Sequence, residues 1–132
     1  MGLHVSHGCY GASYIWFSRF RNELAKAAGY IVKEVKWPYL SEIPLIDYGH
    51  ITQDQVDGIW LETPSDPLMV LLAHSDCEGI IAVAQAGPLA DRIEQLIPLL
   101  PEDEELGYRK AAEHFVTGLR AAVAANETVT FQ

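Results

Sequence analysis

Hydrophobic and polar positions follow two different periods along this chain, and each period predicts a kind of element. In residues 14–28 the apolar side chains return every three or four positions, which places them on one face of a helix. Ser13 is expected to cap the start of this helix, and Gly29 to follow its end. The predicted apolar face holds Trp16, Phe17, Phe20, Leu24, Ala27 and Ala28, with Arg19, Asn22 and Lys26 opposite.

The second half of the chain repeats the helical period. We expect a short helix over Leu68–Ala73, capped by Ser65 or Asp66, with Pro67 at its first position. A longer helix is predicted within Val83–Leu100, with Pro88 marking its effective start. The last helix is expected to open at Pro101 and Glu102–Glu105, because acidic side chains suit a helix N-terminus. Its predicted apolar face holds Leu106, Ala111, Ala112, Phe115, Val116, Leu119, Ala122 and Val123.

Shorter segments alternate in the way that β-strands do. Leu3–Ser6, Tyr30–Trp37 and Thr128–Phe131 are predicted strands, and the last is expected to pair with the first. The region between Pro38 and Pro67 is predicted to be mostly loop, with short pieces at 52–57 and 59–62. The sequence therefore predicts a single small α+β domain over residues 1–132. It would contain about three main helices, an EF-hand-like helix–turn–helix and a small sheet that pairs the N- and C-terminal strands.

Composition narrows the function classes. The 132 residues are 49% hydrophobic and 20% charged, which is typical of a folded domain with a core. Nine basic against eighteen acidic residues give a net charge of −9, which argues against a nucleic-acid partner or a membrane surface as partner. With no leader-like start and no apolar run of membrane-spanning length, we expect a cytoplasmic protein. Cys9 and Cys77 are expected to be free thiols.

The charge is unevenly distributed. Residues 1–40 hold five basic and two acidic side chains, residues 41–105 hold one and fourteen, and residues 106–132 hold three and two. The acidity thus belongs to the middle of the chain. A small anionic ligand remains compatible with the first segment.

The sequence HSDCEG (74–79) resembles part of a calcium-binding EF-hand loop. With Gly79 at the invariant glycine position, Asp76 and Glu78 fall at ligand positions. His74 and Gln85, however, occupy the first and last positions, where a carboxylate is needed. We therefore expect a structural turn between helices, with Asp76 and Glu78 as weak metal candidates.

A zinc site is a second metal hypothesis. His74 and Cys77 would have to meet His4, His7 and Cys9 from the N-terminal segment. Two histidines three positions apart on a strand point to opposite faces, which disfavours that site. No cofactor is expected.

The segment HGCYGAS (7–13) lies between the first predicted strand and the first helix. Glycines there let the backbone turn sharply, and free amides at a helix start attract anions. The segment matches neither the phosphate-binding loop of nucleotide hydrolases nor the dinucleotide fingerprint. The candidate ligand-binding residues are His4, His7, Gly8, Tyr10, Gly11, Tyr14, Arg19 and Arg21. The alternative is that the tyrosines only pack and that Arg21 braces an acidic neighbour.

Two other functions remain open. A protein-interaction module that inhibits a host protein would use Trp16, Trp37 and Trp60 as anchors. A small hydrolase would use Cys9 with His7, or a metal at the Asp76 turn. No known catalytic signature is present, so we expect a protein that is not an enzyme.

Three stretches carry a resemblance to a known family: YIWFSRFRNELAKAAG, LLAHSDCEGII and HFVTGLRAAVAANETVTF. They resemble short proteins encoded by phages, prophages and actinobacteria that share an HSDC[DE]G turn, often with Glu where this chain has Gln85. The resemblance implies no catalytic residue. It implies a mobile-element setting, and by analogy a homo-oligomeric sponge in the host cytoplasm that sequesters a defence signalling nucleotide. The leading hypothesis is a non-catalytic binder of a small anionic, nucleotide-like ligand.

Overall fold

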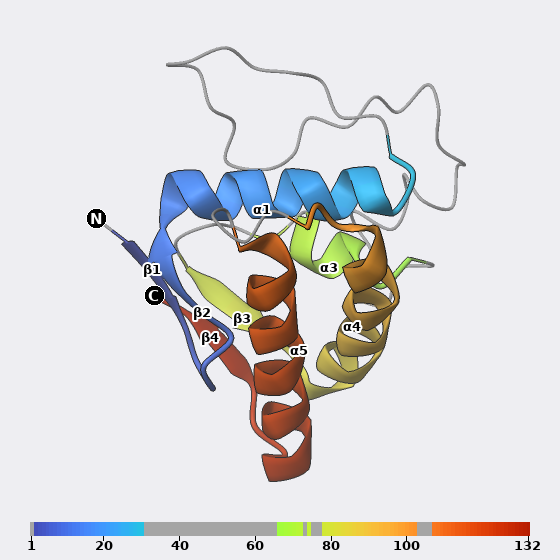
Figure 1. Cartoon of the computed structure of the whole chain (residues 1–132). Helices are drawn as coiled ribbons and strands as arrows, with labels where there is room; N and C mark the ends of the chain where they lie inside the picture. The colour runs from blue at the N-terminus through green and yellow to red at the C-terminus, as the bar shows by residue number, and fades with distance from the viewer. Residues whose placement is uncertain (1, 31–65, 73, 75–77, 103–106) are drawn as a thin grey trace.

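The two ends of the chain meet in the middle of one antiparallel sheet. The computed structural model describes residues 2–30, 66–72, 74, 78–102 and 107–132. Its strands are β1 (Gly2–Val5), β2 (Tyr10–Ser13), β3 (Gly79–Ile81) and β4 (Val129–Phe131), in the order β2-β1-β4-β3. His4 and Gln132 exchange two backbone hydrogen bonds of 2.9 and 2.8 Å. The predicted pairing of the N- and C-terminal strands is confirmed, and the fold is α+β (Figure 1).

Four helices pack beside this sheet in the part of the chain that the structure describes. They are α1 (Tyr14–Ala27), α3 (Met69–Leu72), α4 (Val83–Leu96) and α5 (Tyr108–Ala125), with a 3-10 turn, η2 (Ile97–Leu99), after α4. Helix α1 crosses one end of the domain, whereas α4 and α5 run side by side below it (Figure 1). The predicted strand beyond Tyr30 and the pieces at 52–57 and 59–62 lie outside the described residues.

The segment between the first strand and α1 differs from the prediction. His7 and Gly8 have positive φ angles of 62° and 75°, and the Cys9 N–H donates to the Ser6 carbonyl at 3.2 Å. Positive φ at both central residues is the signature of a type I′ turn, which closes a two-residue hairpin. The predicted seven-residue loop is therefore wrong, because its second half is the strand β2. Gly11 lies opposite His4 in that strand instead of turning the chain.

Helix α1 follows its sequence signals. The Ser13 hydroxyl accepts the Trp16 N–H at 3.2 Å, and the helix ends just before Gly29. Phe17, Phe20 and Leu24 are fully buried on its inner face. The predicted cap, end and apolar face are confirmed for these residues.

Asp66 ties three elements together. Its carboxylate accepts the Leu68 N–H at the start of α3, the Tyr30 hydroxyl and the Arg92 Nε–H of α4, at 3.0, 2.5 and 3.1 Å. A buried carboxylate is stable only when its oxygens have such donors. Asp66 is therefore the cap of the short helix, as predicted, and also links that helix to α1 and α4.

Two predicted helix starts are wrong. Helix α4 begins at Val83, five residues before Pro88, because the Gln85 side chain accepts the Ala82 N–H at 3.0 Å and supports the first turn. Pro88 is tolerated inside the helix since it lies on the exposed side, where water can bond the carbonyl that loses its donor. Helix α5 begins after Gly107, whose left-handed conformation (φ 70°) cannot continue a helix from Glu102.

Helix α5 packs tightly on the hairpin turn at Gly118. A Cβ atom on this glycine would lie 2.5 Å from Cys9 Sγ and 2.8 Å from both the Cys9 nitrogen and the His7 oxygen. Two of these three neighbours are backbone atoms, which have little freedom to move. The residue at 118 therefore sets how closely α5 approaches β2.

We predict that Gly118→Ala lowers the free energy of unfolding by about 1–3 kcal/mol, because the added methyl group overpacks this contact. Gly87→Ala is the matched control within α4, where a Cβ would meet only Val123 Cγ2 at 4.0 Å. That substitution should change the free energy of unfolding by no more than about 1 kcal/mol, because the helix propensity of alanine is opposed by the steric restriction that Pro88 places on the preceding residue. Urea unfolding of both variants measures the difference. Equal stabilities would show that the close approach carries no constraint.

Candidate functional site

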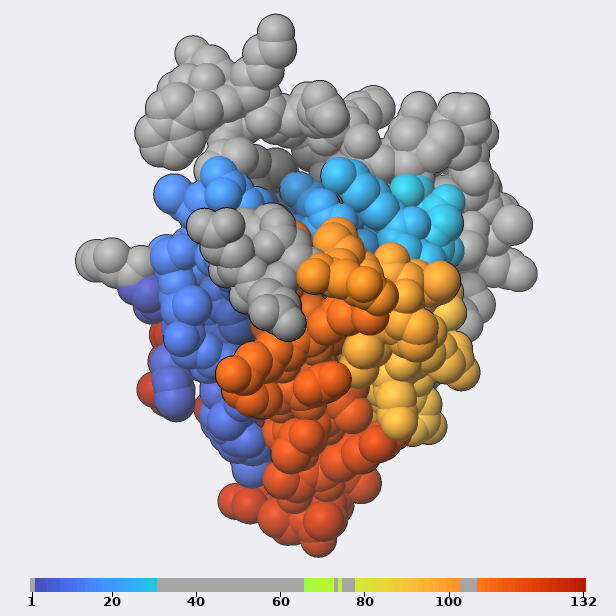
Figure 2. Space-filling model, viewed as in Figure 1, coloured from blue at the N-terminus to red at the C-terminus, as the bar shows by residue number. Residues whose placement is uncertain are grey.

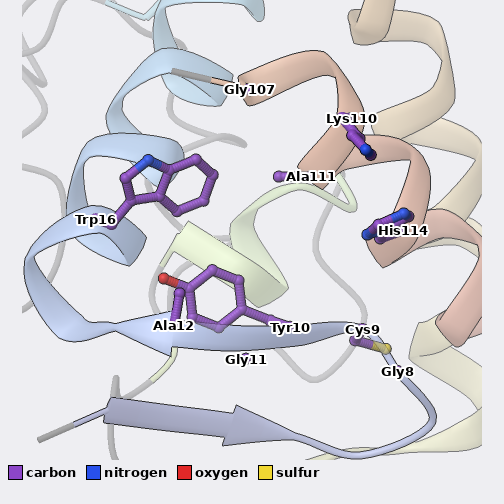
Figure 3. Close-up of a pocket in the computed structure, with 10 residues that line it drawn as sticks. All are labelled: Gly8, Cys9, Tyr10, Gly11, Ala12, Trp16, Gly107, Lys110, Ala111 and His114. Carbon is purple, nitrogen blue, oxygen red and sulfur yellow. The ribbon is translucent and has the colours of Figure 1, made fainter. Parts of the chain in front are cut away.

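A pocket of about 320 Å³ lies between β2 and α5 (Figure 3). The hairpin, the first turn of α1 and the first two turns of α5 line this β2–α5 pocket. Its lining residues are Gly8, Cys9, Tyr10, Gly11, Ala12, Trp16, Gly107, Lys110, Ala111 and His114. Figure 2 shows the N-terminal segment and α5 meeting on the same face of the molecule. The pocket therefore joins segments about 100 residues apart in sequence.

One side of the pocket is aromatic. The Trp16 and Tyr10 rings stack with centroids 5.8 Å apart, and Trp16 also stacks with Phe20 and Tyr108 at 5.5 and 5.4 Å. The Tyr10 hydroxyl donates to the Ser13 carbonyl at 2.7 Å, which fixes the ring. Burial raises the pKa of Tyr10, so its hydroxyl stays neutral at any physiological pH. Such a wall offers a fixed, flat, apolar surface to a ligand.

The other side of the pocket carries two basic side chains. Lys110 and His114 are four residues apart on α5 and both are exposed on the pocket side of the helix (Figure 3). Their side chains form no hydrogen bond or ion pair with any residue in the described ranges. The N-terminus of α5 begins beside them, at Gly107, with no side-chain cap. The helix dipole adds partial positive charge at this end of the pocket.

The structure brings only part of the predicted binding set together. Gly8, Tyr10 and Gly11 line the pocket, whereas His4, Tyr14 and Arg19 do not. His4 is exposed on β1, and Arg19 is exposed on α1. Trp16, Lys110 and His114 were not among the predicted site residues. The sequence shows that Lys110 and His114 are four residues apart, as neighbours on a helix face are. No local pattern, however, indicated that α5 faces the hairpin.

Arg21 is a structural residue. It is 0% exposed, and its Nη1 donates to the Leu71 and His74 carbonyls at 3.3 and 2.5 Å. The guanidinium also lies 4.6 Å from the Phe17 ring centre, a cation–π contact. The prediction that Arg19 and Arg21 act together on a ligand is wrong, because residues two apart on a helix face different directions.

His7 is held by neighbours at the hairpin turn. Its Nδ1 lies 2.8 Å from Ser6 Oγ, and its Nε2 lies 3.5 Å from a carboxylate oxygen of Glu127. The Ser6 hydroxyl in turn accepts the Thr130 N–H at 2.9 Å. These contacts connect the turn to β4 and to the end of α5. His7 is not among the residues that line the pocket.

Cys9 is a buried free thiol. Burial raises its pKa to about 12, so the reactive thiolate is scarce at neutral pH. An activated nucleophile needs the opposite shift. The arrangement therefore gives no support to a Cys9–His7 hydrolase.

The HSDCEG segment, which was predicted to be a structural turn between two helices, is followed by a short strand that begins at Gly79. Gly79–Ile81 forms β3, which pairs with β4 and separates α3 from α4. His74 stacks on Phe131 at 3.9 Å with its Nε2 2.9 Å from the Ile80 carbonyl. Glu78 is exposed, and Asp76 and Cys77 lie outside the described residues. No group of three potential metal ligands occurs among the residues that are described.

A comparison of the chain with known protein families, with curated proteins and with solved structures finds no match. None of the helices in the described ranges is long and apolar enough to cross a membrane.

Arg19 and Arg21 make a matched pair for mutation. We predict that Arg21→Met lowers the free energy of unfolding by about 2–4 kcal/mol, because buried carbonyls lose their donor. Arg19→Met should change it by no more than about 0.5 kcal/mol, as is usual for an exposed side chain. Thermal and urea unfolding of both variants measure these changes. A stable Arg21→Met protein would contradict the structural role.

We also predict that Cys9 resists alkylation. In a Cys77→Ser variant at pH 8, iodoacetamide should modify native Cys9 at least about 100-fold more slowly than the unfolded chain, because the raised pKa and burial both suppress thiolate attack. Mass spectrometry over time measures both rates. Rapid labelling of the native protein would restore the nucleophile hypothesis.

Proposed function

We propose that the protein is a non-catalytic binder of a small anionic ligand with a flat ring, of the kind that a nucleotide presents, and that the β2–α5 pocket is its site. The observation that supports this proposal is that Trp16 and Tyr10 line one side of the pocket while Lys110 and His114 line the other. A ring can lie against the aromatic wall while the anionic group meets the Lys110 ammonium group and a ring N–H of His114.

The size and charge of the pocket support this proposal. Its volume of about 320 Å³ lies at the lower end of the range for small-molecule sites. Its residues come only from the segments 8–16 and 107–114, which belong to the two parts of the chain that are not acidic overall. Most of the negative charge of the chain, −9 in all, belongs to residues 41–105, which contribute no side chain to the described lining of the pocket.

The other functions have weaker support. Trp16 packs within its own aromatic cluster, and the other proposed interaction anchors, Trp37 and Trp60, lie outside the described residues. The buried thiol of Cys9 argues against thiol chemistry. A non-catalytic binder would act by lowering the free concentration of its ligand, which is the sequestering role that the family resemblance implies. Homo-oligomerisation stays a prediction.

We predict that Lys110→Ala and His114→Ala each weaken binding of nucleoside 5′-monophosphates by about 3- to 10-fold, because the first removes a positive charge and the second removes a ring N–H donor to the phosphate. Isothermal titration with the four common nucleotides and with ribose 5-phosphate measures this loss. Raising the salt concentration should weaken wild-type binding more than binding by the double variant.

Arg19→Ala is the control, since it removes an exposed cation outside the pocket. It should bind as the wild type does. If no probe binds the wild type, or if the double variant retains full affinity, the proposed site is wrong.

A further inference from the structure

The main chain of Gly11 forms part of the pocket wall. Glycine has no side chain, so the Gly11 atoms that line the pocket belong to the backbone. A Cβ built at this position would have nothing within 4 Å, so an alanine fits here without a close contact.

The strand register sets the direction of these backbone groups. His4 directs both its N–H and its C=O toward Gln132, on the β4 side of β1. Gly11 is the residue opposite His4 on β2. In an antiparallel pair, residues that oppose each other without mutual hydrogen bonds point these groups away from one another. The Gly11 N–H and C=O therefore face the side of β2 that lies away from β1.

That side is the edge of the sheet. Strand β2 is the first in the order β2-β1-β4-β3 and has one strand neighbour, β1, in the described sheet. The edge presents one donor and one acceptor from the same residue, both directed to the side on which a ligand would lie. Backbone groups in this position need a hydrogen-bonding partner, either water or a ligand.

We infer that the Gly11 main chain recognises the hydrogen-bonding edge of a nucleobase, with the N–H donating to a ring acceptor and the C=O accepting from the adjacent donor. The inference rests on the proposed function and adds selection for the base. Each common base carries an acceptor next to a donor, and a flat base can lie along the Trp16 wall at the same time. A sugar phosphate or a simple aromatic acid lacks that paired edge.

The test replaces Gly11 by proline and by alanine. Gly11→Pro replaces the N–H that faces the pocket by a ring CH2 group, and it should leave the strand pairing intact because Gly11 does not hydrogen-bond to β1 and proline is tolerated at a sheet edge. Gly11→Ala keeps the N–H and is the matched control. Circular dichroism and thermal unfolding report whether each variant keeps the fold.

We expect at least one nucleoside 5′-monophosphate to bind the wild type at least about tenfold more tightly than ribose 5-phosphate does. Gly11→Pro should lose most of that difference while its affinity for ribose 5-phosphate stays unchanged, and Gly11→Ala should retain it. For adenosine 5′-monophosphate, methylation at N1, which blocks the ring acceptor, should weaken wild-type binding to the same degree. If the proline variant unfolds, the comparison of adenosine 5′-monophosphate with its N1-methylated form still tests base recognition.

Several outcomes would overturn the inference. Nucleotides that bind no better than ribose 5-phosphate, or that bind Gly11→Pro as well as Gly11→Ala, would exclude base recognition while leaving the anion site intact. If a short acidic peptide binds more tightly than any nucleotide, and Gly11→Pro abolishes that binding, the β2 edge would instead bind a peptide as an added strand. Failure of the proposed function itself is distinguishable, because then no phosphate probe would depend on Lys110 or His114.

Discussion

The close approach of α5 to the β1–β2 turn sets the distance between this helix and the hairpin. Gly118 permits the approach, since any larger residue there would meet the backbone of Cys9 and His7. The turn is itself fixed by positive φ angles at His7 and Gly8. The backbone of the turn and the backbone of α5 at Gly118 are thus in direct contact. This contact fixes the distance between β2 and α5.

The same contact explains why the pocket lies where it does. Below the contact, α5 and the hairpin are packed together, and Cys9 is buried between them. Toward the start of α5, Lys110 and Ala111 face β2 across the space that Trp16 borders. One helix therefore contributes to the core through Phe115 and Leu119 and to the candidate site through Lys110 and His114. The aromatic cluster around Trp16 keeps the opposite wall in place.

The sequence predicted the individual helices and strands better than it predicted how they pack against one another. Local signals placed α1 between Ser13 and Gly29 and identified Asp66 as a cap, because these depend on neighbouring residues. The hairpin was missed because HGCYGAS was interpreted as one loop, although a histidine followed by glycine can supply both positive φ angles of a tight turn.

The site was predicted only in part for a different reason. Gly8, Tyr10 and Gly11 belong to the segment that sequence reasoning singled out, whereas Lys110 and His114 come from the other end of the chain. Their meeting depends on tertiary packing, which no local pattern encodes. Arg21 was misassigned because its role depends on the Leu71 and His74 carbonyls, which lie about 50 residues away in sequence.

The position of β4 bears on the order in which the protein folds. The β1–β2 hairpin is local and can form within about 1–10 μs, as short hairpins do. Strand β4 lies between β1 and β3, so the sheet is complete only after residues more than 120 positions apart have met. Closing such a long loop costs entropy before any contact repays it, which slows folding. The pairing of β1 with β4 is thus the step expected to limit the folding rate, and β3 can join the sheet only through β4.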